Sequence, residues 1–378
     1  RDDLVTGVQT CALPISWEYR RTRGNASQAM DQMDMFKPVS KWQVRVTDPR
    51  SIDAIMNQAF RVATTGKPGP VVVCVPDDVG SADVDFKAPV DQSAGAIYPH
   101  TRSAPDPAQL AAAVDAFCNA SHPLLVVGGG GHISGCYSEV RELLDKSGAM
   151  LATSISGKAI VEEYHPQVVG VTGTFGNPAA RDVMQQADLI FFIGCKAGQL
   201  TTFSYRCPNQ ETQVIHLDND PEEIGRNFAR TIPLVADATL GLQAFLTALG
   251  ERQTAAAWQF DDINAAHADW YSSSTEPGDP TEPLKPQAMM RLINDVITDD
   301  DLVVCDASLA SGWAAAYLQF QTAGRRMIAP RGLAGLGWGS PATIGAALAT
   351  LGKRRIIQFA GDGGFGYSLQ ELEVMARY

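Results

Sequence analysis

The segment Gly361-Asp362-Gly363-Gly364 combines the residue types that a metal-diphosphate site requires. Its glycines remove side chains where backbone N–H groups could approach phosphate oxygens, and Asp362 supplies a hard carboxylate of the kind that holds Mg²⁺. Residues 354–360 before it contain the nearly continuous apolar run of a buried parallel strand. For a lone Gly-Asp-Gly the alternative is a tight βα turn in which the aspartate only caps a helix.

The residues after this turn predict a capped helix. Ser368 and Glu371 have the S-x-x-E spacing of a capping box, with Ser368 as the cap. Leu369, Leu372 and Met375 then fall on one face of the helix. The pattern is therefore strand, glycine turn and helix, the arrangement in which backbone N–H groups can bind phosphate.

A second glycine-rich segment, residues 330–341, lies upstream and is followed by small residues at 342–349. Together the two segments resemble the diphosphate-binding domain of thiamine diphosphate enzymes of the acetolactate synthase group, which share a G-x-x-G-x-G-x-x-P loop before Gly-Asp-Gly. The resemblance implies that Asp362 is the first Mg²⁺ ligand. It also implies that Leu336 supports the bent cofactor, although a core leucine is the structural alternative. The cofactor-binding residues that it implies are Gly335, Leu336, Gly337, Gly361, Gly363 and Gly364.

Composition sets limits on the class of protein. The chain has 378 residues, of which 45% are hydrophobic, enough for two or three domains. Its net charge of -12 argues against nucleic acid and anionic membrane as partners, and no apolar stretch is long enough to span a bilayer. The seven cysteines never occur as C-x-x-C, so we predict reduced, mostly buried thiols. We expect a cytoplasmic enzyme.

The first part of the chain is interpreted in two pieces. Residues 1–16 have neither helical nor strand periodicity and resemble translated sequencing-adapter read-through, so we expect them to lie outside the fold. Residues 17–90 resemble the late part of a pyrimidine-binding domain. Within them, Asp48 caps a predicted helix over 49–65 that ends at Gly66, and residues 66–79 form a closing strand bounded by prolines.

Residues 91–107 read as a surface linker, and residues 108–250 as a central Rossmann-like domain. Predicted strands at 124–127, 149–153, 189–193 and 214–217 alternate with helices, which indicates a parallel α/β sheet. Residues 128–131 are four consecutive glycines, a possible but weak phosphate loop.

Relatives of this central domain hold FAD, ADP or nothing. Flavin-binding relatives carry an Arg-Phe-Asp-Asp-Arg type stretch where this chain has residues 196–202, so we do not expect bound FAD. Ser154 and Lys158 match a segment that lies near the nucleotide in relatives. A helix-start serine and a solvated lysine are equally good interpretations.

Residues 251–286 read as a second linker, and residues 287–378 as the start of the diphosphate-binding domain. A strand at 302–305 leads to a loop over 306–313. In acetolactate synthases the matching loop carries Gln-His-Gln and contacts the cofactor, whereas this chain has Leu309, Ala310 and Ser311. The identity of the substrate is therefore open.

The fold that the resemblance implies is α/β, with three domains of parallel sheets flanked by helices and the first and last domains incomplete. It implies thiamine diphosphate and Mg²⁺ as cofactors, and a homodimer or homotetramer. The cofactor provides a carbanion for decarboxylation of a 2-keto acid such as pyruvate, with transfer to an acceptor, as in acetolactate synthase. The proton-relay glutamate and the Asn that completes the metal shell match no residue here, so we expect an inactive fragment truncated at both ends. The alternatives are a keto-acid or acyl-CoA decarboxylase or lyase of the same family, a non-catalytic nucleotide-binding module, and a polypeptide without function.

Overall fold

The computed structural model describes residues 10–16, 30–85, 98–279 and 281–378. The chain divides into two compact units, one ending at Arg102 and one running from Ser103 to Tyr378. Each unit is described by itself. The prediction of an α/β protein with parallel sheets flanked by helices is confirmed in both.

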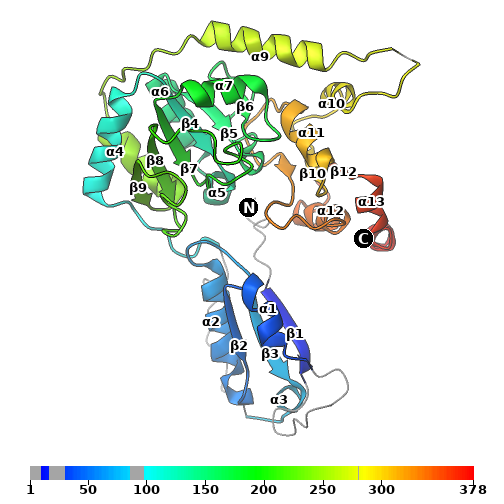
Figure 1. Ribbon diagram of the computed structural model, residues 1–378. Helices are drawn as coiled ribbons and strands as arrows, with labels where there is room; N and C mark the ends of the chain where they lie inside the picture. The colour runs from blue at the N-terminus through cyan, green and yellow to red at the C-terminus, as the bar shows by residue number, and fades with distance from the viewer. Residues whose placement is uncertain (1–9, 17–29, 86–97, 280) are drawn as a thin grey trace. The chain divides into compact units, whose positions relative to one another are not determined.

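The first unit contains a three-stranded parallel sheet in the order β1-β3-β2 (Figure 1). Strand β3 lies in the centre, and most of its side chains are buried. The elements of this unit are β1 (Thr10–Ser16), α1 (Gln32–Phe36), η2 (Lys37–Val39), β2 (Trp42–Arg45), η3 (Pro49–Ser51), α2 (Ile52–Thr64), β3 (Val71–Pro76) and α3 (Asp77–Gly80).

The predicted helix over 49–65 is present as one 3-10 turn, η3, followed by α2. The Asp48 carboxylate accepts a hydrogen bond from the Arg50 N–H at 3.0 Å, as expected of a cap. Gly66, with φ +59°, follows the helix in the left-handed conformation that glycine adopts readily. Ala59 and Ala63 are fully buried in one core cluster with Val71 and Val73 of β3.

Strand β1 corrects our expectation that residues 1–16 lie outside the fold. Thr10 to Ser16 pair in parallel with β3, in register from Thr10 opposite Val71. Because β3 is an apolar strand whose other edge is taken by β2, the apolar residues of this segment can extend the sheet on the free side. Residues 1–9, and residues 17–29 and 86–97 of the predicted domain and linker, lie outside the described residues. The adapter origin stays a prediction.

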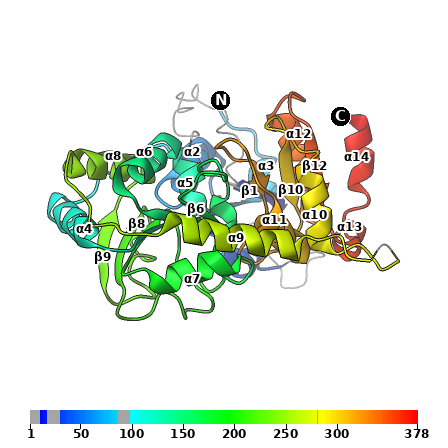
Figure 2. The same ribbon diagram turned by 90° about the horizontal axis from the view of Figure 1, so that it is seen from above.

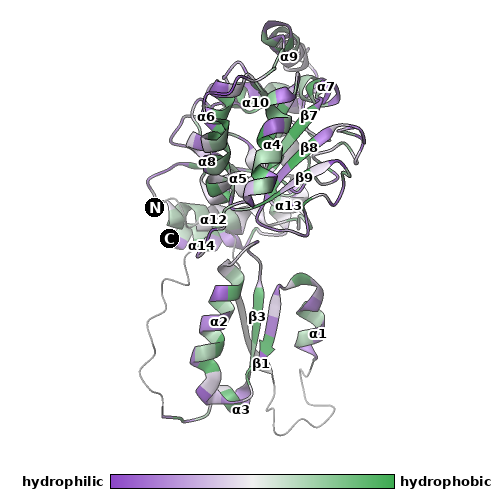
Figure 3. Cartoon of the chain, turned by 90° about the vertical axis from the view of Figure 1, so that its left-hand side faces the viewer, coloured by the Kyte–Doolittle hydropathy of each residue, from purple (hydrophilic) through white to green (hydrophobic). Residues whose placement is uncertain are grey.

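The central domain of the second unit is built on a six-stranded parallel sheet in the order β6-β5-β4-β7-β8-β9. Its middle strands β4 and β7 are buried along their whole length, and β7 is coloured as hydrophobic in Figure 3. The elements are α4 (Pro107–Asn119), β4 (Pro123–Val127), α5 (Gly129–Ser134), α6 (Tyr137–Ser147), β5 (Met150–Thr153), η5 (Ile155–Gly157), β6 (Val168–Val171), α7 (Pro178–Gln186), β7 (Leu189–Ile193), β8 (Gln213–Asp218), β9 (Thr231–Val235) and α8 (Ala238–Leu249).

The four predicted strands of this sheet are confirmed, and β7 matches its predicted range to the residue. The two edge strands, β6 and β9, are absent from the prediction. Pro233 has no backbone N–H to donate, which is tolerated in an edge strand such as β9 and makes the strand hard to recognise in the sequence.

The C-terminal domain contains a three-stranded parallel sheet in the order β11-β10-β12. The strand predicted at 302–305 is β10, and it lies in the centre. The elements are α10 (Pro286–Asn294), β10 (Leu302–Cys305), α11 (Leu309–Tyr317), β11 (Met327–Ile328), α12 (Gly339–Ala349), β12 (Ile356–Phe359), α13 (Asp362–Gly366) and α14 (Glu371–Arg377).

The linker expected over residues 251–286 instead contains helix α9 (Phe260–Ser274), which runs along the outside of both domains (Figures 1 and 2). Its first turns, with Phe260 and Ile263, pack on the central-domain core. Near its end, the ring of Trp270 stacks on Tyr317 of α11 at 5.1 Å. The prediction failed because the two halves of the helix pack on different domains, so its apolar residues form no single stripe in the sequence.

Six of the seven cysteines lie among the residues with described side chains, and all six are buried and free, as predicted. No helix in the described ranges combines the length and apolarity needed to cross a membrane.

Candidate functional site

Three strand ends meet at one edge of the C-terminal sheet, because its strands are all parallel. Asp306 follows β10, Arg331 and the glycine-rich segment follow β11, and Gly361 follows β12. The order β11-β10-β12 places Asp306 between the two glycine-rich segments. The sheet therefore brings together the two segments that the sequence singled out.

Asp306 joins these segments. It is only 1% exposed, and its carboxylate accepts hydrogen bonds from the Gly337 N–H at 3.0 Å and the Gly339 N–H at 3.1 Å. Gly339 is the first residue of α12, so the carboxylate also satisfies a backbone donor at the start of that helix. We did not predict this role. The sequence feature that could have indicated it is an acidic residue that directly follows a buried strand and precedes two small residues.

The Gly-Asp-Gly turn approaches the same carboxylate from the other side. A Cβ atom at Gly364 would lie 2.1 Å from Asp306 Oδ2, so only glycine fits there. Gly337 has φ +83°, and a Cβ atom on it would lie 2.8 Å from the Cβ of Tyr367. The two glycine segments are thus packed against each other around one buried carboxylate.

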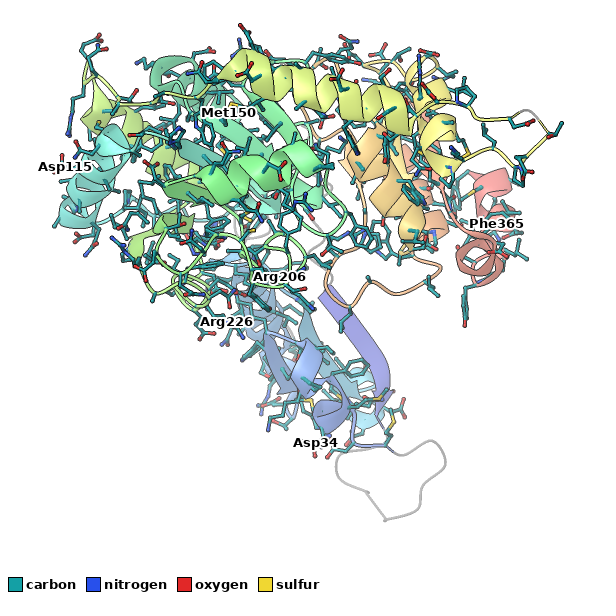
Figure 4. The ribbon with its side chains drawn as sticks, turned by 45° about the horizontal axis from the view of Figure 1, so that its top comes forward. Asp34, Asp115, Met150, Arg206, Arg226 and Phe365 are labelled. Carbon is teal, nitrogen blue, oxygen red and sulfur yellow. The ribbon has the colours of Figure 1, made fainter. Side chains whose placement is uncertain are left out.

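The remaining predicted site residues face open space. A Cβ atom at Gly335, Gly361 or Gly363 would have no neighbour within 4 Å, so packing does not require glycine at these positions. Asp362 is exposed at the start of α13, the helix on which Figure 4 labels Phe365. Leu336 is 54% exposed, which removes the alternative of a core leucine. This side of the two segments is accessible to a ligand.

The predicted capping box at Ser368 is wrong. Helix α14 begins at Glu371, and Ser368 is buried with its hydroxyl directed to the hydroxyl of Ser340 at 2.9 Å. Gln358 of β12 also donates to Ser340, at 3.0 Å. Ser368 therefore connects the turn after α13 to α12 instead of capping a helix. Leu369 and Leu372 of the predicted apolar stripe are half exposed.

The loop after β10 carries backbone strain. Ser308 has φ 149° and ψ -170°, a conformation that is usual only for glycine, while its hydroxyl caps α11 by accepting from the Ala310 N–H at 3.1 Å. Leu309 is exposed in the first turn, and Ser311 is fully buried. The residues that replace Gln-His-Gln therefore present an apolar side chain, not polar ones, at this end of β10.

The glycine run at 128–131 of the central domain has a different role. A Cβ atom at Gly128 would lie 2.3 Å from the Gly194 carbonyl oxygen, and one at Gly130 would lie 2.7 Å from Gly194 Cα. Gly194 directly follows β7, the strand beside β4. These glycines are accounted for by the close packing of two turns, and no ligand is needed to explain them.

Lys158, which matches a nucleotide-side lysine of relatives, is neither solvated nor available to a phosphate. Its side chain is 3% exposed, and Nζ pairs with Glu163 Oε1 at 2.7 Å. Glu163 in turn accepts from the Phe320 N–H of the C-terminal domain at 3.1 Å. Burial raises the pKa of the Glu163 carboxyl, and the nearby Lys158 opposes that rise. The pair binds the two domains of the second unit to each other.

Within the described ranges, no three His, Cys, Asp or Glu side chains gather in a way that could hold a metal ion. Mg²⁺ is commonly held by one or two carboxylates together with phosphate oxygens, not by an all-protein cage. Asp362 has an exposed carboxylate, and the space beside Gly361 and Gly363 is open, so this turn fits a metal held jointly with a diphosphate.

Comparison with known proteins agrees with this geometry. Residues 110–248 match the model of the thiamine pyrophosphate enzyme central domain, and residues 306–378 match that of the C-terminal TPP binding domain of these enzymes. The chain belongs to the thiamine pyrophosphate enzyme family, as its sequence predicts.

Within that family it is similar to large subunits of acetolactate synthase. The "Probable acetolactate synthase large subunit" of Methanococcus aeolicus is 28% identical over 100% of this chain and 66% of the relative. The large subunit of Parasynechococcus marenigrum is 31% identical over 100% of this chain and 61% of its own length. Isozyme 3 of Escherichia coli K12 is 29% identical over 94% and 62%. The chain thus spans slightly less than two thirds of these relatives.

Proposed function

We propose that this chain belongs to an enzyme that uses thiamine diphosphate and Mg²⁺ to decarboxylate a 2-keto acid such as pyruvate and to transfer the resulting carbon unit to an acceptor. The observation that carries the proposal is the Asp306 carboxylate, which accepts hydrogen bonds from Gly337 and Gly339 of one glycine segment and packs against Gly364 of the other. Gly335, Gly363 and Asp362 stay open beside it. The similarity to acetolactate synthase large subunits supports the reaction type.

The residues of this chain divide the work of binding. Asp362 would contribute the carboxylate that holds the metal, and backbone N–H groups around Gly361, Gly363 and Gly364 would bind diphosphate oxygens. Gly335, Leu336 and Gly337 would form the opposite wall. When bound, the cofactor supplies the carbanion chemistry that decarboxylation needs. The protein supplies position and a fixed hydrogen-bond network, because Asp306 is already satisfied by two backbone donors.

The test is calorimetric titration of the full chain with thiamine diphosphate and Mg²⁺. Asp362→Ala should abolish Mg²⁺-dependent binding, because the carboxylate is the only protein side chain proposed for the metal. Asp300→Ala removes an exposed aspartate of the same domain and should leave the affinity unchanged. Equal affinity in Asp362→Ala and the wild-type chain would contradict the proposal.

Binding is the appropriate readout for this chain. None of its glutamates matches the proton-relay glutamate of the family, so we expect no turnover of pyruvate by the 378 residues alone. Measurable turnover with added thiamine diphosphate and Mg²⁺ would contradict that expectation. A homodimer or homotetramer is also proposed for the enzyme, and light scattering coupled to size exclusion would test it.

A second candidate is a keto-acid or acyl-CoA decarboxylase or lyase of the same family. It is favoured by the exposed Leu309 at the position where acetolactate synthases carry a polar side chain. In the enzyme to which the chain belongs, replacing Leu309 by Gln should improve transfer to a second keto acid if the first candidate is right, and should leave that transfer unchanged if the second is right. A non-catalytic nucleotide-binding module would instead bind ADP or FAD and not thiamine diphosphate, which the same calorimetry distinguishes.

A further inference from the structure

Arg331 lies three residues beyond β11, at the same edge of the C-terminal sheet as Asp306 and the Gly-Asp-Gly turn. Its guanidinium donates a hydrogen bond to the hydroxyl of Ser311, in the first turn of α11. It also lies over the ring of Phe175, a central-domain residue, with 6.0 Å from the guanidinium carbon to the ring centre. Phe175 rests against Gly312, where a Cβ atom would lie 2.7 Å from the ring. The guanidinium is therefore held in place from two sides.

This cation has no anionic partner in the part of the chain that the structure describes. Among the residues that the structure describes, no carboxylate lies within ion-pair distance of Arg331, and its Nε is buried without a hydrogen-bond partner. Burial lowers the pKa of the guanidinium from its usual value. The opposing charge that would raise it is the thiolate of Cys305, but burial raises the pKa of that thiol to about 12, so the thiol is neutral near pH 7.

A partly buried guanidinium without an anion is costly. Removing a charge from water costs free energy that only a close counter-charge and further hydrogen bonds recover. The ring of Phe175 compensates for part of this cost, and Ser311 for one donor, but the Nε–H is left unpaired. The planar fork of a guanidinium is complementary to a carboxylate, which accepts two of its N–H groups at once.

We propose that Arg331 binds the carboxylate of the 2-keto acid substrate. The inference rests on the proposed function and adds to it a residue that selects anionic over neutral carbonyl compounds. The alternative anion is the diphosphate. It is disfavoured because the glycine segments gather around Asp306, whereas the guanidinium of Arg331 is hydrogen-bonded to Ser311 and lies over the ring of Phe175.

The experiment compares three probes by calorimetric titration of the full chain: pyruvate, its neutral amide pyruvamide, and inorganic pyrophosphate with Mg²⁺. The variants are Arg331→Gln, Arg331→Lys and, as the matched control, Arg291→Gln, which removes an exposed arginine of α10. Each variant's thermal unfolding is recorded first. Arg331→Lys keeps the positive charge and removes the guanidinium fork. It therefore still tests the inference if Arg331→Gln does not fold.

We expect pyruvate affinity to fall about 10- to 100-fold in Arg331→Gln, the effect of losing a hydrogen bond to a charged group, and less in Arg331→Lys. Pyruvamide and pyrophosphate should bind Arg331→Gln as they bind the wild-type chain, and Arg291→Gln should change nothing. A fall in pyrophosphate affinity that matches that of pyruvate would assign Arg331 to the diphosphate and overturn the inference. Unchanged pyruvate affinity in both Arg331 variants, or no pyruvate binding by the wild-type chain, would also overturn it.

These outcomes are separable from those of the proposed function. If pyrophosphate binds in a manner that depends on Asp362 while pyruvate ignores Arg331, only the present inference fails. If pyrophosphate does not bind the wild-type chain at all, the proposed diphosphate site fails first.

Discussion

The molecule contains two glycine-rich turns after apolar parallel strands, and they serve different purposes. At 128–131, after β4, the directions in which Cβ atoms would point are occupied by protein, above all by the backbone of Gly194. At 361–363, after β12, the same directions are empty for Gly361 and Gly363. Glycine is a packing requirement in the first turn. In the second it leaves space beside an exposed carboxylate.

The cations near the two turns differ in the same sense. Lys158 lies close to the first turn, because its backbone carbonyl is hydrogen-bonded to the His132 ring of α5 at 2.9 Å. The Lys158 ammonium forms an ion pair with Glu163. Arg331 lies beside the second turn's sheet edge and has no acidic partner among the described residues. A glycine run alone therefore does not indicate a phosphate site. What each missing Cβ would meet, and whether nearby charges are already paired, distinguishes the two.

The largest effect expected concerns the paired cation. Glu163→Gln should reduce the free energy of unfolding by about 3–5 kcal/mol, because it leaves the Lys158 ammonium buried without its partner. The double variant Lys158→Met with Glu163→Leu should unfold near the wild-type midpoint, since replacing both charges removes the desolvation cost. Urea unfolding followed by fluorescence measures both. Wild-type stability in Glu163→Gln would mean that Lys158 is not committed to this pair, and the contrast between the two turns would weaken.

The second prediction tests the turns themselves with one substitution. Gly128→Ala should destabilise the chain by about 3 kcal/mol, because its Cβ would lie 2.3 Å from a backbone oxygen that cannot move independently. Gly363→Ala should change stability by less than about 1 kcal/mol, since the space is open and alanine favours a helix. It should nevertheless weaken pyrophosphate binding. If both variants were equally stable, the packing explanation of the first turn would be wrong.

Parts of this arrangement could be predicted from the sequence and parts could not. The continuous apolar runs of β7 and β10 identify their ranges to the residue. A strand that is buried on both faces is apolar throughout, so its own residues are enough to locate it in the sequence. The role of Asp306 could not be predicted in this way. It depends on contact with Gly337, Gly339 and Gly364, which are 31 or more residues away in the chain.

Ser368 and the linker over 251–286 show the opposite error, in which a local pattern was overridden by packing. The S-x-x-E spacing is present, but the serine hydroxyl forms a hydrogen bond with Ser340 of α12 and so does not cap the helix. In α9, each half of the helix packs on a different domain, so its apolar residues do not form a single stripe. Local rules predict elements well where one element's own pattern decides, and less well where two domains decide together.

The third prediction concerns the shared carboxylate. Gly364→Ala should cost about 2 kcal/mol, because the new methyl group would lie 2.1 Å from Asp306 Oδ2. In the background of Asp306→Ala this cost should largely disappear, although Asp306→Ala alone lowers stability by leaving two backbone N–H groups unpaired. A double-mutant cycle in thermal unfolding measures the coupling. Additive effects would mean that Asp306 does not join the two segments.

The smallest effect concerns the other end of β10, where a buried aspartate is paired with a cation. Asp301 accepts two hydrogen bonds from the Arg355 guanidinium, both at 2.7 Å, and these lower the pKa of its carboxyl to about 2. The folded chain therefore favours the charged form, so this stabilisation is complete above the ordinary value of about 3.9 and is lost as the pH falls toward 2. When the pH is lowered from about 4 to about 2, the unfolding temperature should therefore fall less in Asp301→Asn than in the wild-type chain.

Asp300→Asn, which alters an exposed neighbour, should keep the wild-type slope in that window. Equal slopes for Asp301→Asn and the wild-type chain would show that the Arg355 pair contributes nothing to the acid sensitivity of the domain. The result matters for the comparison, because Asp301 and Asp306 bracket one strand and are both buried, yet only Asp301 is neutralised by a side-chain cation among the described residues. An acid-sensitive Asp301 would show that the ion pair at the start of β10 stabilises the fold. At the other end of the strand, the hydrogen bonds that the described residues give to the Asp306 carboxylate come from backbone N–H groups, which agrees with our proposal that this end forms the ligand site.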